Sequence, residues 1–321
     1  MPDTSSQAAY RAFCATAPDV PLFAQPWYLD ACVEGGSWDA VLALKKGRPV
    51  AALPYFVKQK GPFRYATMPP FVKWLGPYLL PELRGQLATE HTVLKDLIAQ
   101  LPPLAAFKQN FYPTITNWLP FYWAGYQQTT YYTYRLTDLD NLPALEARLE
   151  ADMRRTIRKT AKFLRVVHDL NPRILFDFVP AIYQKQQLPM PFSWGQFKRL
   201  DDILAAQQAR KLFFAVDADG RVHGAAQLIW DAQTAYFHLT ADDPTLPQSG
   251  AGKFLIWETI RYAAEVLKLR CFDFEGSILP GVEYVRVRFG AMQVPYFFVW
   301  KNNSRAFALL EGAKSIFRHT N

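Results

Sequence analysis

The chain has 321 residues, of which half are hydrophobic, 15% are aromatic and 20% are charged, so it can build ordinary globular cores and shows no sign of long disorder. At this length two domains of about 150 residues each are expected. The formal charge of +8 favours an anionic partner such as nucleic acid, a nucleotide or an anionic lipid, although a protein can also be basic without one.

Cysteine usage and hydropathy exclude several classes. Cys14, Cys32 and Cys271 lie far apart and no Cys/His cluster occurs, so neither a disulfide framework nor a zinc site is predicted, and we expect no metal. The N-terminal residues lack a signal-peptide pattern, and no apolar run reaches the roughly 20 residues that span a bilayer. We therefore expect a cytoplasmic protein without stable membrane insertion.

The first half of the chain reads as short helices and strands. Residues 38–59 predict a β-hairpin, because two β-rich runs are joined by Lys46-Gly47-Arg48 and glycine permits a positive φ. Further elements follow from local pattern: a short helix before Gly35-Gly36, short strands within 64–80, a helix over 89–102, and a loop and strand over 111–136.

The segment 139–170 is predicted to be strongly helical. Its apolar face would carry Leu149, Met153, Ile157, Ala161 and Leu164. Its opposite face would carry Arg154, Arg155, Arg158, Lys159 and Lys162. Such a basic stripe is either a solvated face or a cradle for the phosphates of a nucleotide, a tRNA or a lipid head group.

The second half repeats a mixed pattern. Helices near 179–187 and 193–210 precede three strands within 211–243, a helix over 253–268 and a strand over 270–274. The span from Tyr236 through Phe274 has the length of a crossover between parallel strands. The fold class is therefore α/β (α+β), with a mixed central sheet flanked by helices occurring twice. The boundary is expected near Thr137–Leu142, which gives domains 1–138 and 139–321.

Two clusters in the second half could carry chemistry. In "QSGAGKF" the side-chain-free Gly250 and Gly252 would let the amides of a helix start approach a phosphate, with Lys253 adding charge, or the loop is purely structural. At the end of the last strand, Asp273 and Glu275 would face a ligand crevice, where a carboxylate can act as a general base. The alternative is that either acid simply pairs with Arg286 or Arg288.

Other patterns are less decisive. Residues 281–289 fit a strand by alternation and a short helix nearly as well. The five histidines are scattered without metal-ligand spacing, and Cys271 lies inside an apolar strand, so a nucleophilic hydrolase is not predicted.

A family resemblance joins these segments. In order, "KLFFAVDADGRVHGAAQLIW", "TAYFHLTADD", "GAGKFLIWETIRYAAE", "CFDFEGS" and "VRFGAMQVPYFFV" resemble the Fem-like branch of the GNAT acyltransferase superfamily. The segments "GRPVAALPYF", "RYATMPPFVKWLGPYL" and "DMRRTIRKTAKF" resemble the same branch, so the resemblance spans most of the chain.

The resemblance implies two tandem GNAT-like domains and transfer of an acyl or aminoacyl group to an amine. It places the donor between strands that part near Thr240 and Phe274. The donor pyrophosphate would lie on Gly250, Ala251, Gly252 and Lys253, and a backbone amide within Leu239, Thr240 and Ala241 would polarise the acyl carbonyl. Glu275 would be the base and Tyr284, on a short helix, would protonate the leaving group.

The donor and the acceptor stay open. The family's phosphate loop usually reads Gln/Arg-x-x-Gly-x-Gly/Ala, but Pro247 stands at the Gln/Arg position, so acyl-coenzyme A and charged tRNA are both retained as donors. The first domain would shape a groove for a small-molecule amine or a cell-envelope precursor, with Tyr65, Lys73 and Tyr78 as candidates unless they are core residues. Arg154, Arg158 and Lys159 are the anion-contact candidates. The rival function is a catalytically degraded GNAT module that binds an anionic partner.

Overall fold

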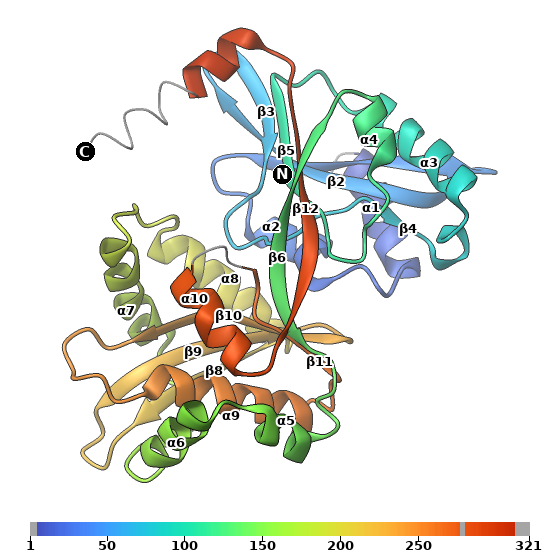
Figure 1. Cartoon of the computed structure of the whole chain (residues 1–321). Coiled ribbons are helices and arrows are strands. Elements are labelled where there is room, and N and C mark those ends of the chain that lie inside the picture. Colours follow the sequence, from blue (N-terminus) through green and yellow to red (C-terminus); the bar gives the residue numbers. More distant parts are fainter. Residues whose placement is uncertain (1–4, 277–279, 312–321) are drawn as a thin grey trace. The chain divides into compact units, whose positions relative to one another are not determined.

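The structure is a computed structural model that describes residues 5–276 and 280–311. The chain divides into two compact units, Met1–Tyr131 with Pro295–Asn321, and Tyr132–Val294 (Figure 1). The C-terminal segment thus rejoins the first unit, which a boundary near residue 138 does not anticipate. The assignment of an acceptor groove to the first domain and of a donor cleft to the second stays a prediction.

The first unit is built on a mixed sheet with helices. Strands β1, β2 and β3 are antiparallel neighbours, β3 pairs in parallel with β5, and β5 pairs with β12. Lys46 and Gly47 have φ values of 51° and 77°, which closes the predicted β1–β2 hairpin. The elements are α1 Ser5–Thr16, α2 Pro26–Ala31, β1 Ser37–Lys45, β2 Arg48–Lys60, β3 Phe63–Thr67, β4 Tyr78–Leu79, α3 Leu87–Gln100, β5 Ala106–Asn110, α4 Leu119–Trp123 and β12 Met292–Asn302, with 3₁₀ turns at Leu22–Ala24 and Pro81–Leu83.

The second unit carries the strand order β6-β11-β10-β9-β8-β7, in which only the β10–β11 pair is parallel among the described residues. The expected crossover is therefore present. Its elements are β6 Gln127–Leu136, α5 Leu142–Arg148, α6 Ala151–Thr160, β7 Arg165–His168, α7 Pro172–Lys185, α8 Trp194–Ala206, β8 Arg210–Val216, β9 Val222–Trp230, β10 Thr234–Asp242, α9 Ala251–Glu265, β11 Cys271–Asp273 and α10 Pro280–Arg288.

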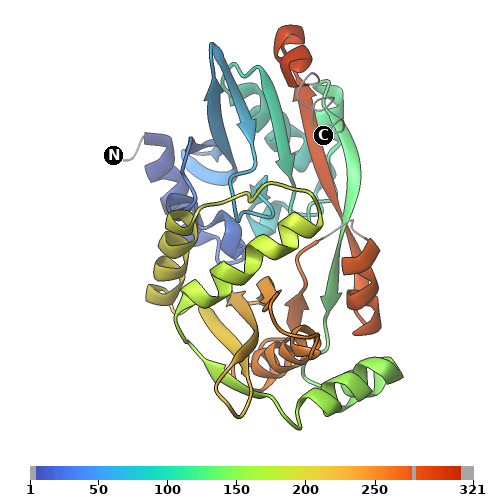
Figure 2. The same cartoon turned by 90° about the vertical axis from the view of Figure 1, so that its left-hand side faces the viewer.

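Helices cover both faces of the second unit's strands. Helix α9 contacts β8, β9 and β10, whereas α7 contacts β9 and β10 and packs on α8. Figures 1 and 2 show α9 and α7 on opposite faces of these strands. The α9 face holds a buried apolar cluster that includes Phe237, Leu255, Phe272 and Phe289. The mixed α/β fold class is confirmed.

The predicted long helix over 139–170 is wrong in two places. Glu150 is extended (φ −61°, ψ 149°) and separates α5 from α6, and its N–H donates to the Arg288 carbonyl at 3.1 Å. Residues Arg165–His168 form strand β7, because β-branched Val166 and Val167 pair with β8. Leu149, Met153, Ile157 and Leu164 are buried as expected, but Ala161 is exposed.

Besides strand β7, three elements were not predicted: helix α1, strand β5 and helix α4. Strand β5 and helix α4 lie in segments that the sequence left as loop or gave no element, and α4 begins with Pro120 in its first turn. Residues 281–289 are resolved in favour of the helix, since α10 covers Pro280–Arg288.

Candidate active site

The parallel pairing of β10 with β11 stops early. The ladder runs from Thr234↔Cys271 to Tyr236↔Asp273, where β11 ends, while β10 continues to Asp242. Over the rest of its length, β10 pairs with β9. In the described chain, one edge of β10 past Tyr236 therefore has no strand partner in β11. The family resemblance places the parting of two strands near Thr240 and Phe274, beyond this last pair, and that placement stays a prediction.

A β-bulge lies at this point of β10. The register with β9 runs Phe237↔Leu228 and then Leu239↔Gln227, so His238 is the extra residue. Bulges re-aim a side chain and often lie next to active sites. The His238 side chain is only 3% exposed.

Glu275 meets His238 across the end of the ladder. His238 Nδ1 and Glu275 Oε1 are 2.7 Å apart, and the Glu275 side chain is 2% exposed. A carboxylate only accepts, so this geometry fits a His238 Nδ1–H that donates to Glu275. Glu275 also has a φ of 51°, a left-handed conformation that is costly for a residue other than glycine. Such strain persists only where the surrounding structure holds it.

Asp273 holds that strained turn in place. Its Oδ1 accepts from Thr133 Oγ1 at 2.5 Å and from the Glu275 N–H at 2.8 Å, and its Oδ2 accepts from Arg135 Nε at 2.6 Å. Complete burial raises the pKa of Asp273, and the Arg135 charge opposes that rise. Asp273 therefore supports the neighbouring Glu275.

Both acids have partners on neighbouring strands. Asp273 pairs with Arg135, and Glu275 pairs with His238. Arg288 instead bridges Glu150 and Asp152 at 2.6 and 2.9 Å. Arg135 and His238 lie close to these acids because the sheet places β6 and β10 beside β11.

His238 is a functional candidate that the sequence did not single out. It was counted among the scattered histidines. The available signal was a lone imidazole inside the apolar strand "TAYFHL", but its partner is 37 positions away and the bulge has no local signature.

The glycine loop before α9 is shaped by the chain itself. Gly250 has a φ of 82°, and a Cβ there would lie 2.7 Å from Thr160 Oγ1 and 2.9 Å from Thr156 Cγ2. Thr160 Oγ1 donates to the Ser249 carbonyl at 2.9 Å, and Ser249 Oγ accepts from the Ala251 N–H at 3.3 Å. Close packing on α6 and the turn conformation account for Gly250 without a ligand.

An acidic side chain lies at the amide end of α9. The carboxylate of Asp242, the last residue of β10, lies against the Gly252 backbone: a Cβ on Gly252 would be 3.2 Å from Asp242 Oδ1. Burial of the carboxyl group raises the pKa of Asp242 to about 6, against the lowering effects of the Gly252 backbone and of His223. Asp242 as a residue is exposed, but its carboxyl oxygens lie against the Gly224 and Gly252 backbone. A carboxylate of the chain itself therefore lies at the expected pyrophosphate site, and coenzyme A binding there stays a prediction.

The remaining donor-site candidates have mixed surroundings. Leu239 and Thr240 are half-buried, Ala241 is buried, and Thr240 Oγ1 donates to the Ala225 carbonyl at 3.1 Å. Tyr284 on α10 is 56% exposed, with the Arg288 guanidinium 4.4 Å from its ring centroid. Buried Ala251 and half-buried Lys253 belong to the first turn of α9. Their proposed roles stay predictions.

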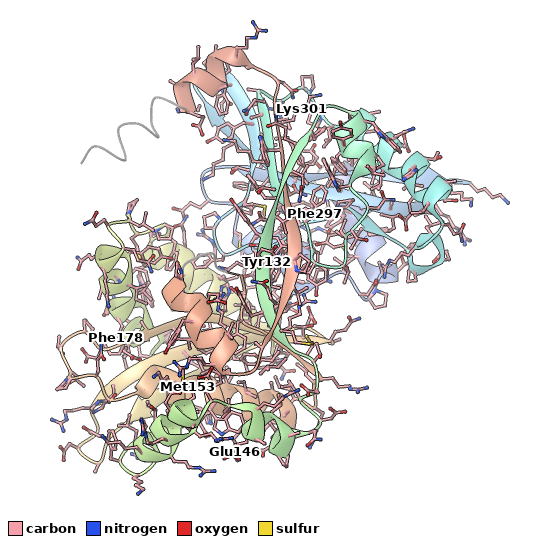
Figure 3. The ribbon with its side chains drawn as sticks, viewed as in Figure 1. Tyr132, Glu146, Met153, Phe178, Phe297 and Lys301 are labelled. Carbon is pink, nitrogen blue, oxygen red and sulfur yellow. The ribbon has the colours of Figure 1, made fainter. Side chains whose placement is uncertain are left out.

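The basic face of α6 divides into a structural and an exposed part. Arg154 Nη1 donates to the carbonyls of Glu146 and Ala147 at 3.2 and 2.6 Å and so caps the end of α5. Arg158 pairs with Glu146 Oε1 at 3.0 Å but stays 71% exposed, and Lys159 is exposed. In Figure 3, Glu146 and Met153 mark the neighbouring helices α5 and α6. Arg154 is thus mainly a capping residue.

The groove candidates of the first unit are partly core. Tyr78 is 6% exposed, whereas Tyr65 is half-buried with its ring 4.8 Å from that of Phe307. Lys73 is half-buried, and its carbonyl accepts from Asn110 Nδ2 at 3.1 Å. For Tyr78 the core interpretation fits.

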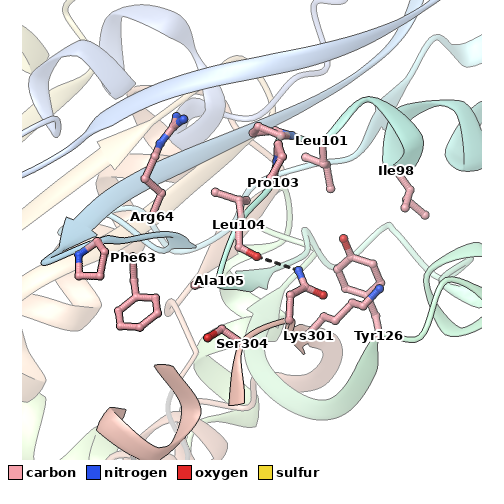
Figure 4. A pocket seen from close by; sticks show the side chains of 13 residues that line it. Phe63, Arg64, Ile98, Leu101, Pro103, Leu104, Ala105, Tyr126, Lys301 and Ser304 are labelled. Atoms are coloured by element: carbon pink, nitrogen blue, oxygen red, sulfur yellow. Dashed lines mark hydrogen bonds between the residues drawn. The ribbon is translucent and has the colours of Figure 1, made fainter. Parts of the chain in front are cut away.

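A hollow of about 540 Å³ does occur in the first unit (Figure 4). It is lined by Phe63, Arg64, Tyr126 and Lys301 among others, and none of the three groove candidates lines it. Lys301 Nζ donates to the Ala124 carbonyl at 2.8 Å, so its ammonium group already has a hydrogen-bond partner within the chain.

The described residues can be assessed for metal-binding groups and for membrane-spanning helices. Within residues 5–276 and 280–311, no group of three or more His, Cys, Asp or Glu side chains could hold a metal ion. Among the same residues, no helix combines the length and the hydropathy that a bilayer span requires.

Comparisons with known proteins agree with this geometry. The family model described as an acetyltransferase (GNAT) domain matches residues 147–284, whereas curated protein sequences give no significant match. This region contains the β10 bulge, the glycine loop and the Glu275 turn.

Solved structures extend the likeness to nearly the whole chain. FemX aligns with a TM-score of 0.67 at 11% identity, covering 92% of this chain and 96% of that one. The C-terminal domain of a putative lysylphosphatidylglycerol synthetase from Agrobacterium fabrum gives 0.57 at 14% identity, covering 97% of both chains. A tandem GNAT protein from the clavulanic acid biosynthesis pathway gives 0.52 at 13% identity, with 93% and 94% covered. Residues 147–284 therefore match a GNAT acetyltransferase domain, and the chain as a whole has a Fem-like double-GNAT fold.

Proposed function

We propose that this protein is an N-acyltransferase that moves an acyl or aminoacyl group from a thioester or ester donor to an amine acceptor. The observation that carries the proposal is the end of the β10–β11 ladder, where a bulged histidine and a strained glutamate form a buried hydrogen-bonded pair. The GNAT-type fold supports acyl transfer in general. The substrates are part of the proposal.

The chemistry assigned to this place is direct attack. The amine nitrogen bonds to the carbonyl carbon of the donor, and the bond from that carbon to the sulfur or oxygen of the leaving group breaks. A backbone amide within Leu239–Ala241 stabilises the oxyanion, since this edge of β10 has no partner in β11. This role is supported by the ladder geometry alone.

Proton transfer falls to the His238–Glu275 pair. The amine proton passes to His238, directly or through water, and Glu275 orients the imidazole and stabilises its charged form. Glu275 is thereby a positioning residue, since its Oε1 lies 2.7 Å from His238 Nδ1 and holds the imidazole. Tyr284 is the proposed acid for the leaving group, because α10 follows the Glu275 turn and its phenol is exposed.

The test uses the full chain with a panel of acyl thioesters and aminoacyl esters, including charged tRNA, against amine acceptors, with product read by mass spectrometry. We expect His238→Ala and Glu275→Gln to lower turnover by about 10²–10⁴-fold. The control Glu265→Gln removes an exposed α9 carboxylate and should leave turnover unchanged. Retained turnover in both site variants would refute the assignment of the pair.

A binding function is the second candidate, favoured by one observation. Arg155, Lys159 and Lys162 are exposed, which suits an anionic partner. If this function holds, replacing these three residues together with Arg158 abolishes function, while Glu275→Gln and Tyr284→Phe do not. The transferase predicts the opposite pattern.

A further inference from the structure

The amide end of α9 is built around the chain's own carboxylate. Asp242 comes from the end of β10, and its carboxylate lies beside Gly252 in the first turn of α9. At a helix start, a carboxylate and a phosphate bind the same groups: the free amide hydrogens at the positive end of the helix dipole.

Two glycines from different elements make room for this carboxylate. A Cβ on Gly252 of α9 would lie 3.2 Å from Asp242 Oδ1, and a Cβ on Gly224 of β9 would lie 2.6 Å from the same atom. Any larger residue at position 224 would displace the acid. The glycines at 224 and 252 therefore accommodate Asp242 itself, and Gly250 accommodates Thr160.

A second anion would meet charge repulsion here. A pyrophosphate bound at these amides would bring its charge beside the Asp242 carboxylate, which lies against the backbone of Gly224 and Gly252. Rejection by an unfavourable contact is an established way to set specificity.

We infer that Asp242 is a specificity-determining residue that keeps coenzyme A out of the amide end of α9. The acyl donor of this protein is then one whose acyl group reaches β10 without a pyrophosphate on the glycine loop. The statement about the acyl donor rests on the proposed function. Exclusion of coenzyme A, in contrast, is a binding property that can be measured without turnover.

The experiment is calorimetric titration of the full chain with coenzyme A and, separately, with inorganic pyrophosphate, at fixed low salt and pH 8. The wild type should show no saturable binding of either up to about 1 mM. Asp242→Asn keeps the shape and removes the charge, and Asp242→Ser also opens space. Both variants should bind coenzyme A about tenfold more tightly than the wild type, or more.

The matched control is Asp243→Asn, which removes the same charge from the next residue, whose carboxylate accepts from the Thr245 N–H at 2.8 Å instead. It should bind no better than the wild type. Saturable micromolar binding by the wild type overturns the inference, and so does an equal gain in Asp243→Asn or no gain in the near-isosteric Asp242→Asn. None of these binding results affects the turnover test of the His238–Glu275 pair. Conversely, a failed turnover test does not affect the binding result for Asp242.

Discussion

Two acidic residues of the second unit stand at places where a ligand was expected, and the fold uses them differently. Glu275 follows β11 in a strained backbone conformation and faces a histidine across the end of the ladder. Asp242 ends β10 in a space made by two glycines, and its carboxylate lies beside the first turn of α9. Strain without a local packing reason points to function, whereas the glycine loop is explained by packing. The comparison teaches that a glycine-rich helix start is weaker evidence for phosphate than it looks.

The largest effect on the free energy of unfolding should come from removing Asp273, which accepts from the Glu275 N–H. Asp273→Ala leaves Arg135 and Thr133 without their buried acceptor and removes the acceptor of the Glu275 N–H, so unfolding should become easier by about 3–5 kcal/mol. The measurement is urea unfolding. The control Asp138→Ala breaks an exposed pair with Arg148 and should cost less than about 1 kcal/mol. Similar costs in the two variants would mean that Asp273 does not hold the turn.

A smaller effect separates conformation from packing at the glycine loop. Gly250→Ala adds a Cβ at positive φ and against Thr160, which should cost about 2–3 kcal/mol of unfolding free energy. Gly47→Ala has a similar φ of 77° but nothing within 4 Å, so it should cost only about 1 kcal/mol. The difference between the two isolates the close approach of α6. Equal costs would show that the loop is not closely packed.

The smallest effect depends on pH. Because burial raises the pKa of Asp242 to about 6, the folded state holds the proton more tightly than the unfolded chain does. Stability from this group is therefore fully present below about pH 4 and is lost as pH rises through 6. Asp242→Asn should raise Tm over the wild type at pH 8 and much less at pH 5. A Tm difference that does not change between these pH values would contradict a buried, strained charge.

The sequence by itself determined most of the strands, the crossover and the class of fold. The hairpin at Lys46-Gly47, the three strands β8–β10 and the helix that became α9 follow from local turn chemistry and periodicity. The same local rules failed over 139–170, because the break at Glu150 is set by a hydrogen bond to the distant Arg288 carbonyl.

Only the tertiary structure decided the site. The sequence named Glu275 but neither its partner nor its strain, since His238 lies on another strand and the bulge depends on register with β9. It left Gly250 and Gly252 open between a phosphate loop and a purely structural loop. In the structure Thr160 lies against Gly250 and Asp242 against Gly252, because α6 and β10 pack on α9. Periodicity reports which face of an element is buried; which polar groups meet there is fixed by contacts between elements far apart in the chain.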